Sequence, residues 1–158
     1  MVRPVQSVRK TRMKGTCMGE APEALAGIRV AIVEDDPSLR VSYALFLRVK
    51  GCRVETFGSA EEAGDARKLG EFGIVISDFL LPGEDGLSLL RRVREASKAV
   101  ITVLVTAHET RDFPEMTRRA GIDAYVAKPI SSEELEGVLL RLTGKGRGGG
   151  QAILVELA

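Results

Sequence analysis

Three consecutive carboxylates follow the first strongly apolar segment of the chain. Glu34, Asp35 and Asp36 come directly after the run Val30–Val33. Adjacent negative charges repel, so each carboxylate raises the energy needed to ionise its neighbour. A chain can tolerate such a cluster at a solvated strand end, where Asp36 before Pro37 would also cap a helix. The other use of the cluster is to bind a cation, since carboxylate oxygens are ligands of hard metal ions.

Three further polar residues end apolar segments later in the chain. Asp78 follows the run "GIVIS", Thr106 ends "AVITVLVT", and Lys128 follows "DAYVA". Short apolar runs of this kind are typical of strands buried on both faces of a parallel sheet. Because the carboxyl ends of parallel strands meet at one edge of a sheet, we expect these residues to lie beside the acidic cluster.

The elements that position these residues alternate along the chain. Strand-like segments are separated by helical patterns that carry caps, such as Ser59 followed by Glu62, and terminal glycines, such as Gly51. The expected strands are residues 28–35, 52–57, 73–79, 99–107 and 123–129. The expected helices are residues 36–51, 59–70, 86–97, 111–121 and 131–144.

This alternation predicts an α/β fold in which helices cover both faces of a parallel sheet. Crossover connections are right-handed, which leaves few possible topologies. We therefore expect a doubly wound five-stranded parallel sheet of order 2-1-3-4-5. In this order the first and third strands are neighbours, so Asp35 or Asp36 lies beside Asp78.

The expected grouping of carboxylates with one lysine fits a cation site better than an apolar core. Mg²⁺ takes oxygen ligands at about 2.0–2.1 Å and commonly shares a phosphate group. The Lys128 ammonium and the Thr106 hydroxyl could both donate hydrogen bonds to a phosphoryl group. Asp78 then lies where a carboxylate nucleophile would attack phosphorus. The residues therefore predict Mg²⁺-dependent transfer of a phosphoryl group to an aspartate.

In this arrangement the sequence resembles the receiver domain of two-component response regulators. The resemblance covers residues 28–142, and it implies the flavodoxin-like receiver fold. It rests on the acidic residues after the first strand, "DFLLPGEDG" with Asp78, Pro82 and Gly86, the pair Thr106–Ala107, and "AGIDAYVAKP" ending in Lys128–Pro129. Each motif alone is weak, but their order at the ends of successive strands is highly specific.

The resemblance implies a phosphoacceptor and a metal site. Asp78 would accept a phosphoryl group from a sensor histidine kinase or a phosphotransfer protein. Asp35, Asp36 and Asp78 would bind Mg²⁺, and the backbone carbonyl of Leu80 would complete the ligands. The domain is then a signalling module and not an enzyme, apart from assisting its own phosphotransfer and dephosphorylation.

The resemblance also implies a switch. Thr106 and Lys128 would bind the phosphoryl oxygens and, with Asp78, carry the catalytic roles. Tyr125 would be the aromatic switch partner of Thr106. The peptide bond between Lys128 and Pro129 is expected to be cis. Because no output domain follows the receiver domain, we expect output through contacts with a downstream protein target.

Two other classes of function remain open from the residues. An unphosphorylated pseudo-receiver that acts only as an interaction domain is the alternative, although every expected site residue is present. A Mg²⁺-dependent hydrolase with an aspartyl nucleophile usually needs a second acid two residues on, where this chain has Leu80, and a cap insertion.

Gly83 and Gly86 most simply serve the turn after Pro82.

Several polar residues near the expected site have simpler interpretations. Glu34 is expected to be a solvated neighbour of the metal site. His108, two residues after Thr106, is expected on the rim of the site. The basic residues Arg111, Arg118 and Arg119 are expected to form a solvated face, with a docking surface for a kinase or a target as the alternative.

Composition sets the class of the protein. The chain has 158 residues, a hydrophobic fraction of 44%, a charged fraction of 28% and a net charge of +1, as expected for a soluble globular domain with no nucleic-acid partner. Cys17 and Cys52 have neither disulfide nor metal-ligand spacing. The chain has no membrane-spanning run and no signal peptide, so we expect a cytoplasmic protein with reduced thiols.

The ends of the chain differ from its middle. Residues 1–27 are expected to be a disordered basic leader, residues 28–142 the receiver domain, and residues 143–158 a Gly-rich linker with a short apolar tail. The tail segment "AILVEL" has strand-like composition and could extend the edge of a sheet or pair with a partner. A loosely packed tail is the simpler interpretation.

Overall fold

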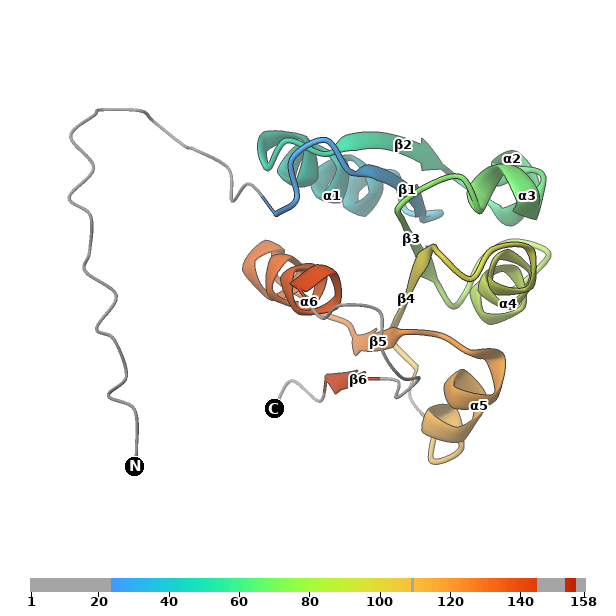
Figure 1. Ribbon diagram of the computed structural model, residues 1–158. Helices are drawn as coiled ribbons and strands as arrows, with labels where there is room; N and C mark the ends of the chain where they lie inside the picture. The colour runs from blue at the N-terminus through green and yellow to red at the C-terminus, as the bar shows by residue number, and fades with distance from the viewer. Residues whose placement is uncertain (1–23, 109, 145–152, 156–158) are drawn as a thin grey trace, which may run out of the picture.

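The computed structural model describes residues 24–108, 110–144 and 153–155 (Figure 1). Within these residues, six parallel strands form one sheet of order β2-β1-β3-β4-β5-β6. The strands are β1 (Arg29–Val33), β2 (Arg53–Phe57), β3 (Ile74–Asp78), β4 (Ile101–Thr106), β5 (Ala124–Ala127) and β6 (Ile153–Val155). The predicted order 2-1-3-4-5 is confirmed for the first five strands.

The helices cover both faces of this sheet, as predicted. They are α1 (Pro37–Val49), α2 (Ala60–Ala63), α3 (Ala66–Leu69), α4 (Gly86–Ala96), α5 (Phe113–Ala120) and α6 (Ser132–Gly144). Figure 1 shows α1 and α6 on one side of the strands, and α2, α3, α4 and α5 on the other. The sheet is therefore the middle layer of three.

Alternation along the strands divides the core into two apolar clusters. In β1, Val30 and Ile32 point toward α1 and α6, whereas Ala31 and Val33 point toward the opposite helices. All four side chains are essentially inaccessible to solvent. Successive side chains of a strand face opposite sides of the sheet, so a strand covered on both faces must be apolar throughout.

The start of α1 confirms the capping interpretation of Asp36. Its Oδ1 accepts hydrogen bonds from the backbone N–H groups of Ser38 and Leu39, at 2.8 and 3.1 Å. Pro37 occupies the first helical position, where a missing N–H is harmless. The carboxylate is therefore oriented toward the helix by its own chain neighbours.

The single helix predicted over residues 59–70 is wrong in extent. Ser59 caps α2 as expected, because its Oγ accepts a hydrogen bond from the N–H of Glu62 at 3.0 Å. Gly64 then adopts a φ of 75°, a conformation that favours glycine and ends α2. Asp65 caps a new helix, α3. The glycine and the acid together split the segment in two.

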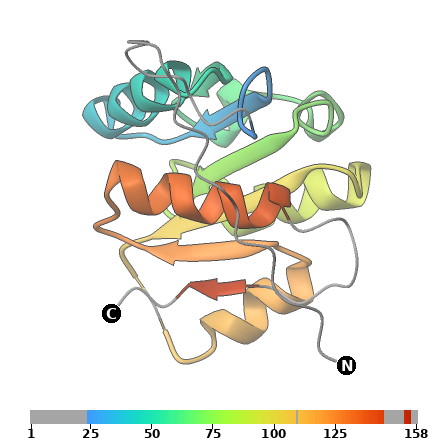
Figure 2. The ribbon, with the colours of Figure 1, turned by 60° about the vertical axis from the view of Figure 1, so that its left-hand side comes forward.

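The apolar tail supplies a strand that the simpler interpretation did not include. β6 pairs with β5 in parallel, with Ala124 opposite Ile153 and Val126 opposite Val155. Figure 2 shows β6 beside β5 at the end of the sheet. The expectation of a loosely packed tail is therefore wrong for Ile153–Val155, where the sheet-edge alternative holds. Residues 145–152 and 156–158 lie outside the described residues.

At the other end, packing begins before residue 28. Leu25 is fully buried in the core, and its carbonyl oxygen accepts a hydrogen bond from the Cys52 thiol at 3.4 Å. Residues 1–23, which make up most of the predicted leader of residues 1–27, lie outside the described residues. Of the helices that the structure describes, none has the length and apolar character needed to cross a membrane.

Candidate functional site

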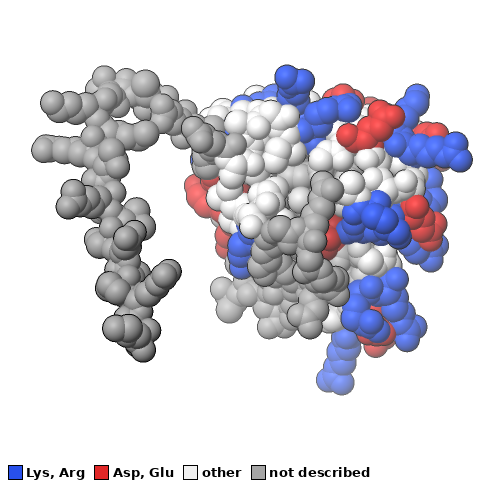
Figure 3. Space-filling view, in the orientation of Figure 1, with Lys and Arg blue, Asp and Glu red and all other residues white. Residues whose placement is uncertain are grey.

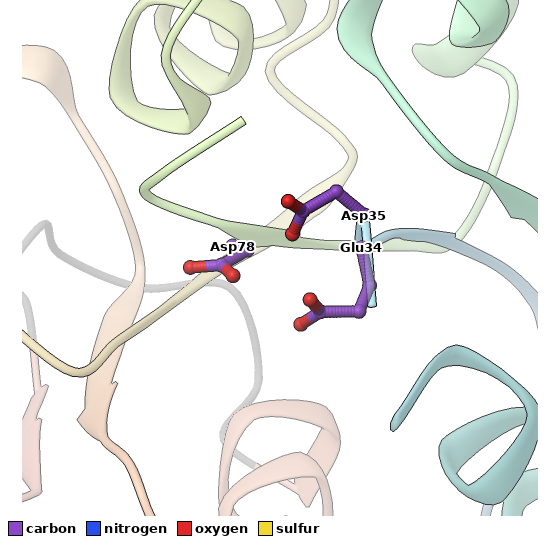
Figure 4. A group of neighbouring side chains, drawn as sticks. All are labelled: Glu34, Asp35 and Asp78. Carbon is purple, nitrogen blue, oxygen red and sulfur yellow. The ribbon is translucent and has the colours of Figure 1, made fainter. Parts of the chain in front are cut away.

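Three carboxylates converge at the carboxyl ends of β1 and β3. Glu34 and Asp35 follow β1, and Asp78 is the last residue of β3. One oxygen from each carboxylate lies within 4.8 Å of the others (Figure 4). Glu34 and Asp78 are buried, with 2% and 8% of their surfaces exposed, whereas Asp35 is exposed. The expected acidic cluster therefore forms, and it opens to solvent on the Asp35 side.

Lys128 binds two of these carboxylates at once. Its Nζ donates hydrogen bonds to Asp78 Oδ2 at 2.8 Å and to Glu34 Oε2 at 2.9 Å. Burial alone would lower the pKa of Lys128, but the hydrogen bonds and charges of Asp78 and Glu34 outweigh burial and raise it. The ammonium group therefore stays charged and offsets part of the repulsion between the carboxylates.

Glu34 is not the solvated neighbour that the sequence suggested. Burial raises its pKa, and the opposing hydrogen bonds from Lys128 and from the backbone N–H of Asp36 do not cancel that effect. The fold therefore holds a carboxylate in a place that disfavours its ionised form. A buried acid that is held at a loss of stability is a common sign of a functional role.

Asp36 does not belong to the converging cluster. Its carboxylate caps α1, while its backbone N–H donates to Glu34 Oε1 at 3.1 Å. The structure thus brings Asp35 and Asp78 together, as expected, and puts Glu34 in the place expected of Asp36. Pro37 was the signal in the sequence, because a proline at the first helical position assigns the preceding acid to the cap.

The backbone around Asp78 is tightly constrained by Gly86. A Cβ atom on Gly86 would lie 1.8 Å from the carbonyl oxygen of Asp78 and 2.7 Å from Ser77 Oγ. The backbone N–H of Gly86 donates a hydrogen bond to the carbonyl oxygen of Phe79 at 2.9 Å. The loop after β3 therefore folds back onto the strand end, and only glycine allows this approach. The sequence indicated a turn here but not the contact with Asp78.

The loop after β3 also contacts the Asp78 carboxylate directly. The backbone N–H of Leu80 donates to Asp78 Oδ1 at 3.3 Å. Leu80 itself is exposed. Asp78 is thus held through one carboxylate oxygen by Lys128 and through the other by the loop after β3.

Thr106 lies at the carboxyl end of β4, where the sequence placed it. It is 1% exposed, and it follows Val105, which is paired with Asp78 in the sheet. Its hydroxyl donates to the carbonyl oxygen of His108 at 3.2 Å and accepts from the N–H of His108 at 2.9 Å. The hydroxyl is thus engaged with the loop after β4 in this structure, and His108 is exposed there.

Tyr125 is buried in β5, with 5% of its surface exposed. Its ring packs edge-to-face against Phe113, with 5.3 Å between ring centroids. β5 pairs with β4 in the register that places Tyr125 opposite Leu104, two residues before Thr106. The cis peptide bond predicted between Lys128 and Pro129 is confirmed.

The basic residues of α5 are paired with an acid of the same helix. Glu115 accepts hydrogen bonds from Arg118 and Arg119, and all three side chains are exposed. Figure 3 shows basic and acidic side chains interleaved over the face that carries α4 and α5. Arg118 and Arg119 are solvated, which was the default interpretation, but Glu115 makes their face one of mixed charge.

The donor atoms of the cluster suit a hard divalent cation. Glu34, Asp35 and Asp78 offer only carboxylate oxygens, the ligands that Mg²⁺ prefers. No other group of three or more candidate metal-binding side chains is found among the described residues. The chemistry of the donor set therefore fits Mg²⁺.

Comparisons with known proteins agree with this geometry. The response regulator receiver domain family matches residues 30–139. The transcriptional regulatory protein TrcR of Mycobacterium tuberculosis is 32% identical over 133 residues, which cover 80% of this chain and 51% of TrcR. The C4-dicarboxylate transport transcriptional regulatory protein DctD of Pseudomonas aeruginosa is 31% identical over 110 residues, 70% of this chain and 24% of DctD. The chain thus spans about half or less of these relatives.

Solved structures show the same fold. A receiver domain protein from Methanospirillum hungatei aligns with a TM-score of 0.71 and 24% identity, covering 76% of this chain and 96% of that protein. The BeF3-activated DrrB receiver domain aligns with a TM-score of 0.68 and 26% identity, covering 75% of this chain and 99% of that domain. Since the family match extends over most of the sequence, from β1 into α6, the chain belongs to the response regulator receiver domain family.

Proposed function

We propose that Asp78 accepts a phosphoryl group from a sensor histidine kinase or a phosphotransfer protein. One observation supports the proposal: Lys128 holds the Asp78 carboxylate at 2.8 Å, and oxygens of two further carboxylates lie within 4.8 Å of it. In the transfer, an Asp78 oxygen forms a bond to phosphorus as the bond from phosphorus to the donor breaks. The incoming group must approach from the Asp35 side, where the cluster is exposed to solvent.

We assign the metal site to Glu34, Asp35 and Asp78, with the backbone carbonyl of Leu80 as a further ligand. Glu34 replaces Asp36 in this assignment, because the Asp36 carboxylate caps α1. Bound there, Mg²⁺ would neutralise the clustered carboxylates and the negative charge of a phosphoryl group. Asp36 instead orients Glu34 through its backbone N–H.

Lys128 and Thr106 would stabilise the phosphorylated form. Phosphorylation adds a charge of about −1.5 to −2 at neutral pH. The Lys128 ammonium uses two donors on Asp78 and Glu34, which leaves one N–H for a phosphoryl oxygen. The Thr106 hydroxyl can donate to the same group only after it leaves His108. Movement of Thr106 would change the loop after β4 and the packing around Tyr125.

The output would be a changed surface that a partner protein binds. A partner shifts the equilibrium between the two conformations of the domain only through its different affinities for them. A downstream protein target should therefore bind phosphorylated and unphosphorylated chains with different affinities. In this scheme the domain is a signalling module whose chemistry is limited to its own phosphorylation and dephosphorylation.

The test is phosphorylation by acetyl phosphate, followed by mass spectrometry of the intact chain. We expect one phosphoryl group per chain with Mg²⁺ present, none with the metal chelated, and none in Asp78→Asn. Asp65→Asn is the matched control, since Asp65 is an acid that caps α3 and does not belong to the carboxylate cluster. Stoichiometric labelling of Asp78→Asn would falsify the assignment of the acceptor. A folded wild-type chain that is never labelled would instead support the pseudo-receiver alternative.

A further inference from the structure

A row of three aromatic rings leads away from the phosphoacceptor. Phe79 directly follows Asp78, and its ring packs edge-to-face on Phe113, with 5.2 Å between centroids and 81° between planes. Phe113 packs in the same way on Tyr125, at 5.3 Å and 73°. The row therefore joins the loop after β3 to α5 and to β5. Edge-to-face ring pairs hold a defined mutual orientation, unlike general apolar contacts.

The Phe79 end of the row is anchored to the site. The backbone N–H of Phe79 donates to the carbonyl oxygen of Val105 in β4 at 2.9 Å. Its carbonyl oxygen accepts the hydrogen bond from Gly86. A change in the backbone at Asp78 therefore reaches the Phe79 ring within one residue, by a route that does not pass through Thr106.

The Phe113 ring is the main apolar attachment of α5. Of the eight residues of α5, only Phe113 and Thr117 are buried. The Thr117 hydroxyl donates within the helix, to the carbonyl oxygens of Phe113 and Pro114. The capping residue Asp112 makes no side-chain hydrogen bond to the helix. A helix of this length has little stability alone, and its position therefore depends on its packing. In α5 that packing is mainly the Phe113 ring.

The far end of α5 is held separately. The Arg94 side chain on α4 donates to the carbonyl oxygen of Gly121 at 2.9 Å and pairs with Asp123. Between the two attachments, α4 and α5 enclose a surface groove of about 210 Å³ that includes Leu87, Arg91 and Met116. A displacement of the Phe113 ring would therefore alter the α5 wall of this groove.

We infer that Phe113 is a positioning residue that couples the loop after Asp78 and the Tyr125 ring to α5. Phosphorylation of Asp78 then repositions α5 through the aromatic row, in addition to any route through Thr106. This inference rests on the proposed function, because it requires that Asp78 is the acceptor. It assigns a role in signalling to a buried ring that does not contact the phosphoryl group.

The test compares responses at two places in one chain. Beryllofluoride with Mg²⁺ serves as the probe, and backbone amide shifts are followed by NMR in the full chain. In the wild type, shifts are expected at Asp78 and Lys128 and also at Met116 on α5. In Phe113→Leu the shifts at Asp78 and Lys128 should remain. The response at Met116 should fall at least roughly two- to tenfold, the range that one aromatic pair contributes to an equilibrium constant.

The ratio of the Met116 shift to the shifts at Asp78 and Lys128 separates coupling from general destabilisation. Phe72→Leu is the matched control, since Phe72 is buried on the same face of the sheet and packs against Arg29 outside the row. It should lower the melting temperature without changing the ratio. Phe79→Leu breaks the row at its other end and should also lower the ratio. This second variant provides the test if Phe113→Leu does not fold.

Each outcome decides a different point. A full Met116 response in Phe113→Leu, or in Phe79→Leu where the first variant does not fold, overturns the coupling role. An equal fall of the ratio in Phe72→Leu overturns it as well, because the effect would then be general. A wild-type chain with no response at Asp78 contradicts the proposed function, and the inference with it.

Discussion

Two clusters of oppositely charged side chains in this protein have similar hydrogen-bond distances but different surroundings. Lys128 lies 2.8 and 2.9 Å from Asp78 and Glu34, which are 50 and 94 residues away in the chain. Glu115 lies 2.6 and 2.9 Å from Arg118 and Arg119, three and four residues away. The side chains of the first cluster are 3–15% exposed, and those of the second 47–76%.

The difference shows that burial, and not contact distance, decides what a charge contributes. On the surface, water solvates each charge and screens the pair, so the net contribution is small. In the site, each charge has lost water, and only its partners compensate for that loss. Removing one partner there leaves an uncompensated charge. The predictions below break each cluster in turn.

Gly86→Ala should have the largest effect, since it breaks the buried cluster through the backbone of Asp78. The new Cβ would lie 1.8 Å from the Asp78 carbonyl oxygen, so the loop or the strand end must move. We expect a loss of about 3–5 kcal/mol in the free energy of unfolding, together with loss of phosphorylation. Urea denaturation measures the first quantity and mass spectrometry the second.

Gly137→Ala is the control for that substitution. Gly137 lies within α6, and a Cβ there meets no atom within 4 Å. Alanine should raise the free energy of unfolding by about 0.5–1 kcal/mol, because it favours helix more than glycine does. Equal stability of the two alanine variants would contradict the close contact between Gly86 and Asp78.

Lys128→Met should have the next largest effect. It leaves Glu34 and Asp78 facing each other without the ammonium that offsets their repulsion. We expect a loss of about 2–3 kcal/mol in the free energy of unfolding, below the full value for a completely buried pair because the site is partly open to water. Added Mg²⁺ should restore part of the loss. Lys50→Met, which breaks the Lys50–Glu136 pair between α1 and α6, should lose less.

Glu34→Gln should separate stability from binding. Because the pKa of Glu34 is raised in the folded chain, mainly by burial, folding favours its protonated form. The stability from this group is complete below its ordinary pKa and is lost as the pH rises toward the raised value. At pH 7 the neutral glutamine should therefore leave the free energy of unfolding unchanged or raise it by up to about 1 kcal/mol.

The same variant should lose most of the stabilisation by Mg²⁺, measured as the rise in melting temperature on adding the ion. Asp36→Asn is the comparison, because asparagine also caps helices and Asp36 lies outside the cluster. It should keep the response to Mg²⁺. A normal response in Glu34→Gln with a lost response in Asp36→Asn would return the metal site to Asp36.

Glu115→Gln should have the smallest effect, since it breaks only the exposed cluster. The melting temperature at pH 7 should stay within about 2 °C of the wild type. Hydrogen bonds from Arg118 and Arg119 lower the pKa of Glu115 to about 2. The contribution of this group is thus present above its ordinary pKa and is lost as the pH falls toward 2. Melts at pH 7 and pH 3, in low and high salt, test it: a large difference between wild type and variant that persists in high salt would contradict the comparison.

The sequence by itself determined the order of the first five strands and the meeting of Asp78, Thr106 and Lys128 at one edge of the sheet. Apolar runs buried on both faces, such as residues 74–76 of β3, are typical of a central parallel strand. Asp78, Thr106 and Lys128 end such runs, so the meeting of parallel strand ends at one edge was enough to predict their neighbourhood. The cap at Asp36 was also local, because a carboxylate before Pro37 reaches the helix N–H groups of its own segment.

Local signals already assign the Asp36 carboxylate to the helix cap, but only the tertiary structure brings Glu34 together with Asp35 and Asp78. The choice of Glu34 depends on Lys128, a residue 94 positions away that lies between the strand ends. The closeness of Gly86 to Asp78, the row from Phe79 through Phe113 to Tyr125, and the pairing of β6 with β5 also join segments far apart in the chain. Spacing along a sequence reports the periodicity of one segment and the caps at its ends. It carries no distance between side chains of different segments, and those distances decide which charges and rings meet.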